Sequence, residues 1–270
     1  MMKLIRYLFL TFITVISSWI ILHLILRPKQ THPIMIGHRG AAGLAPENSL
    51  SAIKIGINHG ARFIEVDVQQ SSDGQVLVIH DILVDRTSNG MGAVGSLPWA
   101  DLQKLDIGSH FSPDYSDERI PSLEQVFTLL QDHPDVTLVI EGKDPHLYRH
   151  LARNLIQIID AFDMAERVII ISFDHAWLSE VSQLAPTIRT GSIWWEKGFL
   201  TNLPPPKIVD VAWPMILLDP TLVYRLRRQG KSVWIYTADN PYLMRLLVAL
   251  GVEGITTNRP DLWANERIGE

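Results

Sequence analysis

The chain has 270 residues, and its 24 Lys and Arg against 29 Asp and Glu give a formal net charge of −5. Residues 1–30 hold four of the basic groups and no acidic ones, so the remaining body carries 20 basic and 29 acidic groups and lacks the basic surface that nucleic-acid binding requires. Hydrophobic residues make up 47 %, which excludes global disorder, and the absence of cysteine excludes disulfides, thiolate metal sites and cysteine nucleophiles.

The first predicted element is a helix over residues 7–26, where twenty consecutive positions carry no charge. At about 1.5 Å per residue such a helix spans roughly the 30 Å hydrocarbon core of a bilayer. A buried helix and a cleaved signal peptide are the alternatives. The apolar run is longer than the signal-peptide core of about 7–15 residues, and no A-x-A-like site follows it. We therefore expect residues 1–30 to be an N-terminal, single-pass membrane anchor.

The orientation of this anchor is indicated only by a small difference in basic residues. Lys3, Arg6 and the amino terminus precede the apolar run, and Arg27 and Lys29 follow it. Because basic residues favour the cytoplasmic side, we expect the N-terminus inside and the body, residues 31–270, on the extracytoplasmic side.

In the body, short β-branched runs alternate with longer helical patterns. The predicted strands cover residues 34–37, 62–67, 136–141, 167–171, 187–191, 207–211, 232–236 and 253–256. The predicted helices cover residues 49–59, 122–132, 146–162, 175–184, 219–229 and 240–250, and residues 191–207 are ambiguous. Eight strands in about 240 residues, mostly followed by helices, favour a closed parallel α/β barrel, with a doubly wound open sheet as the alternative.

One stretch interrupts this alternation, at residues 66–80. Asp73-Gly74 lies between two alternating runs and predicts a β-hairpin. If the turn centres on this pair, His80 lies opposite Asp67. Residues 81–121 then form a long insertion after the second strand, and so long an excursion in a compact domain is usually functional, as a lid or a substrate-selecting subdomain.

Polar side chains with complementary chemistry follow several predicted strands. They are His38 and Arg39 after the first strand, Glu65 and Asp67 in the second, His80 after the hairpin, and Glu141 and Lys143 after the third parallel strand. The carboxyl ends of parallel strands meet at one face of such a fold, where ligands bind. Each cluster alone is a weak indication, because strand-end carboxylates often only cap helices and a single histidine is often structural. Their joint occurrence favours an active site.

The chemistry of these residues suits a phosphate ester. Three carboxylates repel one another unless a cation shares their site, and oxygen ligands favour Mg²⁺ or Ca²⁺ over zinc. Arg39 and Lys143 are donors for a phosphate, and two histidines can act as general base and general acid. A cation, cationic side chains and an acid–base pair together can cleave a phosphate ester.

The order and spacing of these residues resemble the glycerophosphodiester phosphodiesterase family over about residues 34–263. The resemblance is carried by His38-Arg39-Gly40, Pro46-Glu47-Asn48-Ser49, Glu65-Val66-Asp67, Asp73-Gly74, His80-Asp81, Arg86-Thr87, residues 120–124, Glu141-Gly142-Lys143, Ser172-Phe173, Gly230 with Val233-Trp234, and residues 251–260. It implies a TIM barrel with a small insertion after the second strand, at about residues 81–121. It also implies hydrolysis of glycerophosphodiesters to sn-glycerol 3-phosphate and an alcohol.

The resemblance assigns roles to individual residues. It implies that Glu65, Asp67 and Glu141 hold the divalent metal, that His38 and His80 are the acid–base pair, that Arg39 and Lys143 hold the phosphate, and that Trp234 lines the pocket. Two departures matter. Gly142 stands where the family usually has Ile, which predicts a looser strand end. The sequence from Trp234 to Thr237 departs from the usual Trp-Thr, which affects substrate contacts there.

Several alternatives stay open at this point. The enzyme is alternatively a lysophospholipase D acting on lysophospholipids, because the anchor and the apolar residues Trp194, Trp195, Phe199 and Leu200 favour a lipid substrate. A catalytically inactive barrel that binds a phosphorylated ligand is a third possibility. The nucleophile is either the substrate's own glycerol 2-hydroxyl or water, and either histidine can be the first base. The expected partners are a small-molecule substrate and, through residues 7–26, a membrane; no obligate protein partner is evident.

Overall fold

The computed structural model describes the chain except residues 1, 27–32, 196–205, 220, 266–267 and 269–270. Side chains of residues 2–5, 8, 20–26 and 264 also lie outside the description. Phe199 and Leu200, which the sequence associates with a lipid substrate, are therefore outside the described residues.

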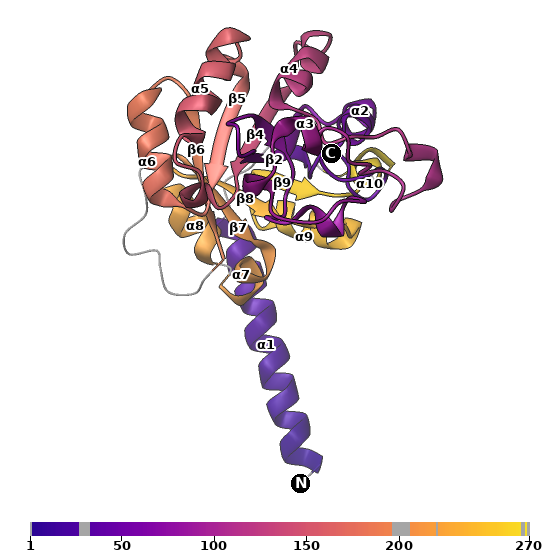
Figure 1. Cartoon of the computed structure of the whole chain (residues 1–270). Helices are drawn as coiled ribbons and strands as arrows, with labels where there is room; N and C mark the ends of the chain where they lie inside the picture. Colours follow the sequence, from indigo (N-terminus) through magenta and orange to yellow (C-terminus); the bar gives the residue numbers. More distant parts are fainter. Residues whose placement is uncertain (1, 27–32, 196–205, 220, 266–267, 269–270) are drawn as a thin grey trace.

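The body is a closed barrel of eight parallel strands surrounded by helices (Figure 1). The strands are β1 (Ile34–Gly37), β2 (Phe63–Gln70), β4 (Thr137–Gly142), β5 (Val168–Ser172), β6 (Arg189–Trp194), β7 (Ile208–Ala212), β8 (Ser232–Tyr236) and β9 (Gly254–Thr257). Strand β1 pairs in parallel with β9 on one side and with β2 on the other, and this pairing closes the sheet. The predicted TIM barrel is confirmed, and the open sheet is excluded.

Most of the helices form an outer layer between successive strands. They are α2 (Leu50–Asn58), α4 (Leu123–Gln131), α5 (Leu151–Ala161), α6 (His175–Leu184), α7 (Trp213–Leu218), α8 (Thr221–Arg228), α9 (Pro241–Ala249) and α10 (Pro260–Asn265). Polar side chains begin several of them: Ser49 Oγ accepts from Ala52 N–H, and Ser122 forms a capping box with Gln125. The main hydrophobic core lies between these helices and the outer face of the barrel.

The interior of the barrel is filled by alternate residues of the strands. Ile36, Val139, Ile169, Ile208 and Trp234 belong to one buried cluster there. Because side chains two apart on a strand share a face, the next inward positions toward the carboxyl ends lie above this cluster. Those positions include the polar residues described below.

The expected hairpin forms, with a register that differs by one residue from the prediction. Strand β3 (Val76–Val78) runs antiparallel to β2, and Val68 lies opposite Val78. Residues 72–74 make a three-residue loop, in which Gly74 adopts a φ of +93° that a glycine adopts without steric cost. Asp67 therefore lies opposite Ile79, whose N–H donates to the Asp67 carbonyl at 3.0 Å. The expectation that His80 pairs with Asp67 is wrong, because the turn has one residue more than a two-residue Asp-Gly turn.

The insertion at residues 81–121 packs as a small subdomain at the carboxyl end of β2. It contains the short helix α3 (Trp99–Leu102) and the 3₁₀ segments η1 (Val84–Arg86), η2 (Val94–Ser96) and η3 (Pro113–Tyr115). Five of its residues form a buried cluster together with Leu77 and Ile79 of the hairpin: Val84, Val94, Leu102, Ile107 and Ile120. The subdomain is thus a packed wall beside the mouth of the barrel.

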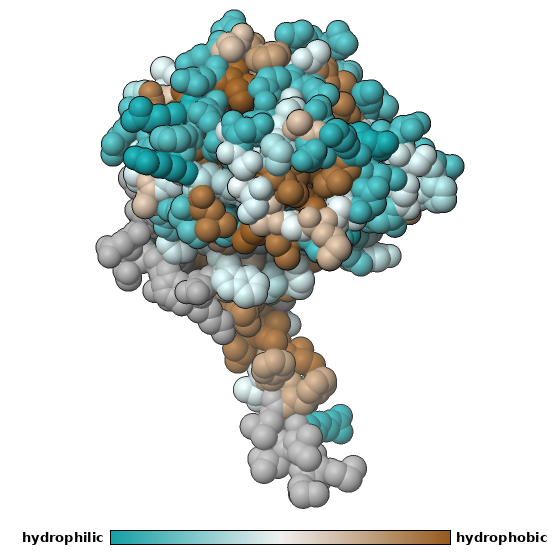
Figure 2. Space-filling model, in the orientation of Figure 1, coloured by the Kyte–Doolittle hydropathy of each residue, from teal (hydrophilic) through white to brown (hydrophobic). Residues whose placement is uncertain are grey.

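Helix α1 (Met2–Leu26) precedes the barrel and extends away from it (Figure 1). Large side chains along it are exposed, among them Tyr7, Phe9 and Phe12. In Figure 2 much of the described part of this stalk is brown, the colour of hydrophobic residues. Within the described part of the chain, however, we find no helix that combines the length and the hydropathy required to cross a bilayer. The structure therefore gives no support to the transmembrane anchor predicted over residues 7–26.

Candidate active site

Three buried carboxylates meet at the carboxyl ends of β2 and β4. Glu65 and Asp67 are two residues apart on β2 and share its inward face, and Asp67 lies opposite Glu141 on β4. One oxygen from each residue lies within 4.8 Å of the others. The structure thus brings together all three residues that the resemblance assigns to a metal.

These carboxylates differ in their electrostatic surroundings. Burial and the repulsion from Asp67 raise the pKa of Glu65 well above its ordinary value. Burial likewise raises the pKa of Glu141 to about 7, although Lys143 opposes the change. Burial would also raise the pKa of Asp67, but Lys143 and Arg39 outweigh it and lower that pKa to about 2. The cluster therefore has an excess of negative charge that a cation would relieve.

The three carboxylates fit a hard divalent cation. Among the described residues, Glu65 Oε1 is buried and has no hydrogen-bond partner, although its Oε2 accepts from the N–H of Arg39 at 2.7 Å. An unsatisfied buried carboxylate oxygen is costly unless something coordinates it. A set of carboxylate oxygens suits Mg²⁺ or Ca²⁺ rather than zinc.

Two cationic side chains border the carboxylates. Arg39 has a left-handed backbone, with φ of +48°, and its Nε lies 3.3 Å from Asp67 Oδ2. Lys143 Nζ lies 2.7 Å from Glu141 Oε1 and 3.4 Å from Asp67 Oδ1. A non-glycine residue in this backbone region is typical of functional sites, where surrounding contacts hold it. Both cations line the same cavity and are suited to an anionic phosphate.

His38 has a defined hydrogen-bond partner on the far side of its ring. Its Nδ1 lies 2.6 Å from Asn258 Oδ1, and Asn258 Nδ2 donates to Asp239 Oδ2 at 2.6 Å. Because the Asn258 amide nitrogen donates to the Asp239 carboxylate, the Asn258 amide oxygen accepts a hydrogen bond from the Nδ1–H of His38. Nε2 is then unprotonated and lies 3.9 Å from Glu65 Oε2. Burial and the nearby Arg39 lower the pKa of His38 to about 4, so the ring is neutral at neutral pH.

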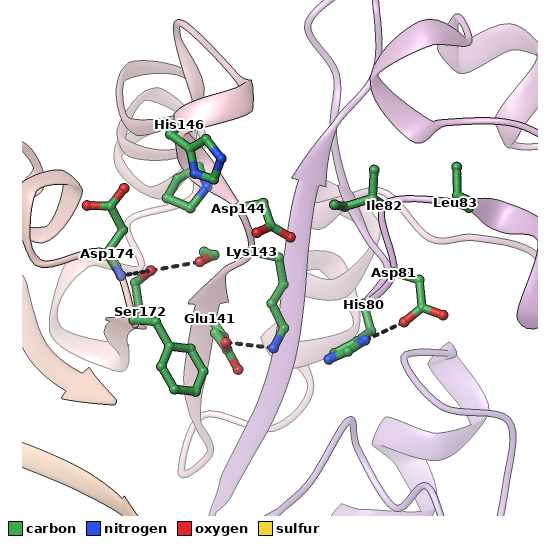
Figure 3. A pocket seen from close by; sticks show the side chains of 13 residues that line it. His80, Asp81, Ile82, Leu83, Glu141, Lys143, Asp144, His146, Ser172 and Asp174 are labelled. Carbon is green, nitrogen blue, oxygen red and sulfur yellow. Dashed lines mark hydrogen bonds and ion pairs between the residues drawn. The ribbon is translucent and has the colours of Figure 1, made fainter. Parts of the chain in front are cut away.

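His80 belongs to a chain of ion pairs that extends to Arg39. Its Nδ1 lies 2.5 Å from Asp81 Oδ1, and Arg86 donates to the same carboxylate. Figure 3 marks the contact between His80 and Asp81. Arg86 also donates to both oxygens of Glu47, at 2.7 and 2.9 Å, and Glu47 accepts from Arg39 at 2.7 Å. The hydrogen bonds from Arg86 lower the pKa of Asp81 to about 2. This series of ion pairs fixes the position of His80 relative to Arg39.

The side chains face a cavity of about 270 Å³ inside the barrel mouth. It is lined by His38, Arg39, Glu65, His80, Glu141, Lys143, Ile171, Phe173, Ile193, Asp210, Tyr236, Thr237 and Thr256. An outer groove of about 610 Å³ shares His80, Glu141, Lys143 and Phe173 with this cavity. Figure 3 shows His80 and Glu141 on either side of Lys143 in this groove.

Trp234 is placed differently from the expectation that it lines the pocket. It is buried in the barrel interior, where its ring packs edge-on against Phe63 with centroids 6.0 Å apart. Among the described residues, Tyr236, two positions further along β8, lines the cavity instead. The strand continues for two residues beyond Trp234, so the next inward side chain reaches the mouth.

Four residues around the site were not assigned a role from the sequence. Glu47, Arg86 and Asn258 lie in strings that carry the family resemblance, but only the structure shows which side chains they contact. Asp239 is 19 residues from Asn258, and nothing in the sequence pattern pairs the two. Long-range hydrogen bonds of this kind are set by the positions of the strand ends.

The end of β4 is tightly packed at Gly142. A Cβ at this position would lie 2.5 Å from two ring carbons of Trp177, which is buried. Ser172 Oγ donates to the Gly142 carbonyl at 2.8 Å. The Trp177 ring therefore occupies the space of a side chain at position 142, and the expected looser strand end is not observed.

The family model and the related proteins that match this chain all indicate the same family. The family model described as the glycerophosphoryl diester phosphodiesterase family matches residues 38–262. A glycerophosphodiester phosphodiesterase from Caldanaerobacter subterraneus subsp. tengcongensis is 35 % identical over 246 residues, covering 86 % of this chain and 96 % of the relative. One from Bacillus subtilis is 32 % identical over 257 residues, covering 87 % of each.

Solved structures share the fold over most of their length. An Oleispira antarctica phosphodiesterase, in complex with the product sn-glycerol-3-phosphate, superposes with a TM-score of 0.81 at 24 % identity, covering 87 % of this chain and 96 % of that one. A glycerophosphodiester phosphodiesterase from Agrobacterium tumefaciens superposes with a TM-score of 0.73 at 26 % identity, covering 86 % of this chain and 99 % of that one.

Proposed function

This chain belongs to the glycerophosphoryl diester phosphodiesterase family, and we propose that it hydrolyses glycerophosphodiesters to sn-glycerol 3-phosphate and an alcohol. The observation that carries the proposal is the gathering of three carboxylates, two histidines, one arginine and one lysine around the barrel mouth. The product bound to the related Oleispira antarctica enzyme supports this substrate class.

Glu65, Asp67 and Glu141 would hold a divalent cation, Mg²⁺ or Ca²⁺. When bound, such an ion withdraws electron density from the phosphate and neutralises charge that develops in the transition state. The remaining contribution comes from side chains around the ion. Arg39 and Lys143 bind the non-bridging phosphate oxygens, and their attraction increases as negative charge accumulates there.

The two histidines divide the proton transfers. We assign His38 as the base, because its neutral ring presents an unprotonated Nε2 to the site. It takes the proton of the attacking hydroxyl while the new P–O bond forms. His80 then gives a proton to the departing oxygen as the P–O bond to the alcohol breaks, and Asp81 holds its ring for this transfer.

The attacking hydroxyl is either the substrate's own glycerol 2-hydroxyl or water. The first would give a cyclic phosphate that a second attack by water opens. Phosphorus NMR of a reaction quenched during turnover distinguishes the two, because the cyclic ester has a separate resonance.

The test of the proposed function uses the purified protein and a panel of glycerophosphodiesters. We expect release of sn-glycerol 3-phosphate that stops with EDTA and returns with Mg²⁺ or Ca²⁺. His38→Ala and His80→Ala should each reduce kcat by about 10²–10⁴. Loss of less than about tenfold in both variants would contradict the assigned acid–base roles.

A second candidate activity, lysophospholipase D, is favoured by the apolar residues at the outer groove. Ile82 and Leu83 line this groove and are 41 % and 51 % exposed, and Phe173 is 48 % exposed. Such a rim could bind the acyl chain of a lysophospholipid. Choline release from lysophosphatidylcholine, compared with that from glycerophosphocholine, distinguishes the two activities. Without release from the lysolipid this candidate is excluded.

Localisation stays a prediction from the sequence alone. The exposed apolar side chains of α1 support association with a membrane, although none of the described helices has the length and apolar character needed to cross one. Fractionation of cells expressing the full chain or residues 31–270 tests the prediction. Equal distribution of both proteins between membrane and supernatant would contradict it, and protease accessibility of the body would establish the side.

A further inference from the structure

The cavity contains a fourth carboxylate that the mechanism above does not use. Asp210 lies on β7, two residues after the inward-facing Ile208, and is 3 % exposed. In the closed strand order β7 is three strands from β4 and four from β2, so Asp210 faces the metal-site carboxylates from across the barrel. It lines the same cavity as they do.

Asp210 has no cationic partner in the part of the chain that is described. Its Oδ1 is buried without a hydrogen-bond partner, and burial together with repulsion from Glu141 raises the pKa of Asp210 well above the ordinary aspartate value. The N–H of Val211 is its stabilising contact. Asp67 and Glu141, in contrast, both contact Lys143. A buried carboxylate without a counter-charge is costly, so a ligand that supplies one gains from binding there.

Two aromatic rings border the same part of the cavity. Phe173 and Tyr236 pack edge to face, with centroids 6.1 Å apart and planes at 89°. The Tyr236 hydroxyl donates to the Trp194 carbonyl at 3.1 Å and is therefore directed toward β6, on the far side of β7 from β8. A carboxylate with aromatic rings is the combination that binds ammonium groups, by charge and by cation–π attraction.

We propose that Asp210, with Phe173 and Tyr236, binds an ammonium group on the alcohol part of the substrate, and so selects choline and ethanolamine esters of glycerophosphate. This inference rests on the proposed function. The competing possibility is a neutral Asp210 that hydrogen-bonds a glycerol hydroxyl. Glycerol is common to every glycerophosphodiester, so that contact would not distinguish one ester from another.

The experiment measures kcat/KM for glycerophosphocholine, glycerophosphoethanolamine and the uncharged glycerophosphoglycerol. In Asp210→Asn we expect the ratio of the cationic to the uncharged substrates to fall by about tenfold or more, as for loss of a hydrogen bond to a charged group. Asp144→Asn is the matched control, because Asp144 lines only the outer groove. In Asp144→Asn the ratio of kcat/KM for the cationic substrates to that for the uncharged substrate should change by less than about threefold, because an exposed charge is screened by solvent.

A binding measurement separates this proposal from the hydrolytic function. Tetramethylammonium, titrated into the metal-loaded protein by calorimetry, should bind the unchanged chain about tenfold more tightly than Asp210→Asn. Equal binding, or an equal loss of kcat/KM on all three substrates, would overturn the ammonium site while leaving hydrolysis intact. If no substrate is hydrolysed but tetramethylammonium binding depends on Asp210, the proposed function fails and the site stands.

Discussion

Asn258 Oδ1 lies 2.6 Å from Nδ1 of His38, although 220 residues separate the two in sequence. Asn258 is itself held by Asp239, which accepts from both its side-chain and its backbone N–H. Only one amide orientation satisfies these contacts, and it selects the His38 tautomer with a free Nε2. Asp239 and Asn258 are thus positioning residues for the proposed base.

Replacement of Asn258 by Asp is the first prediction. The new carboxylate still accepts from Nδ1–H, but it stabilises the imidazolium and raises the His38 pKa from about 4. Because the base must be neutral, the acidic limb of the kcat/KM profile should move to higher pH. Asn258→Ala should lower kcat by about 10–100-fold without this displacement, as when a supporting residue is removed. An unchanged profile in Asn258→Asp would contradict His38 as the base.

The second prediction concerns Arg86, which links Asp81 and Glu47. Arg86→Ala should reduce kcat/KM by about 10–100-fold, because His80 and Arg39 both lose a positioning contact. Its side chain is half exposed, so the free energy of unfolding should change little. Arg86→Lys should restore only part of the activity, since an ammonium cannot pair with two carboxylates in the same fork geometry.

Arg62→Ala is the control for this series. Arg62 is similarly exposed and forms one ion pair, with Asp135, at the amino-terminal ends of β2 and β4. That end is remote from the catalytic face of a barrel. Equal loss of kcat/KM in Arg86→Ala and Arg62→Ala would show that surface charge, rather than the chain from His80 to Arg39, determines the effect.

The third prediction is a pH-dependent stability of the metal-free protein. The pKa of Glu141 is raised to about 7 in the folded state, so the folded state binds a proton more tightly than the unfolded chain. Its stabilising contribution is complete below the ordinary Glu pKa and is lost as pH rises through about 7. The low pKa of Asp67, about 2, contributes stability that is lost only at far lower pH.

The low pKa of His38, about 4, makes stability rise with pH until the unfolded histidine is also neutral, at about pH 6.5, and so opposes the effect of Glu141 below that pH. Thermal unfolding with EDTA should therefore give a Tm that falls as pH rises from about 6.5 to about 8. Mg²⁺ or Ca²⁺ should raise Tm more at the higher pH, because deprotonated carboxylates bind the ion. Glu141→Gln should flatten the pH dependence and weaken metal binding. A metal-free protein whose Tm is independent of pH over this range would contradict the electrostatic description of the cluster.

The strands of the barrel were predictable because buried parallel strands have continuous β-branched runs. Seven of the eight side chains assigned to the site gather at the barrel mouth, since alternation on β2 and the common carboxyl ends of parallel strands place them there. Trp234 differs, because the sequence pattern does not give the depth at which an inward side chain lies. The hairpin register differs for a related reason, since an Asp-Gly pair occurs in loops of more than one length.

Other features of the site depend on contacts that no sequence pattern contains. In the sequence Asp210 is one polar residue in the apolar strand β7, and only the closure of the barrel brings it under the electrostatic influence of Glu141. The pair of Asn258 and Asp239 forms because β8 and β9 are neighbours in the closed sheet. Such contacts can be recognised only once the three-dimensional arrangement of the strand ends is known.

The fourth prediction concerns Gly142, which separates a proposed metal ligand from a proposed phosphate ligand. Gly142→Ile introduces a Cβ 2.5 Å from the Trp177 ring, and overpacking of this kind costs about 1–3 kcal/mol in the free energy of unfolding. Because β4 must shift, the spacing of Glu141 and Lys143 changes, and kcat/KM should fall with stability. Denaturant unfolding and turnover are measured on the same preparations.

Trp177→Leu, alone and combined with Gly142→Ile, completes a double-mutant cycle. The single change should destabilise the protein, because it leaves a cavity beside Gly142. In the double variant the isoleucine side chain fills that cavity, so the free energies of unfolding should be non-additive, with a favourable coupling of about 0.5–3 kcal/mol. Additive effects would mean that Trp177 does not occupy the space of a side chain at position 142. Partial recovery of kcat/KM in the double variant, beyond Gly142→Ile alone, would tie the packing of this strand end directly to the geometry of the metal and phosphate ligands.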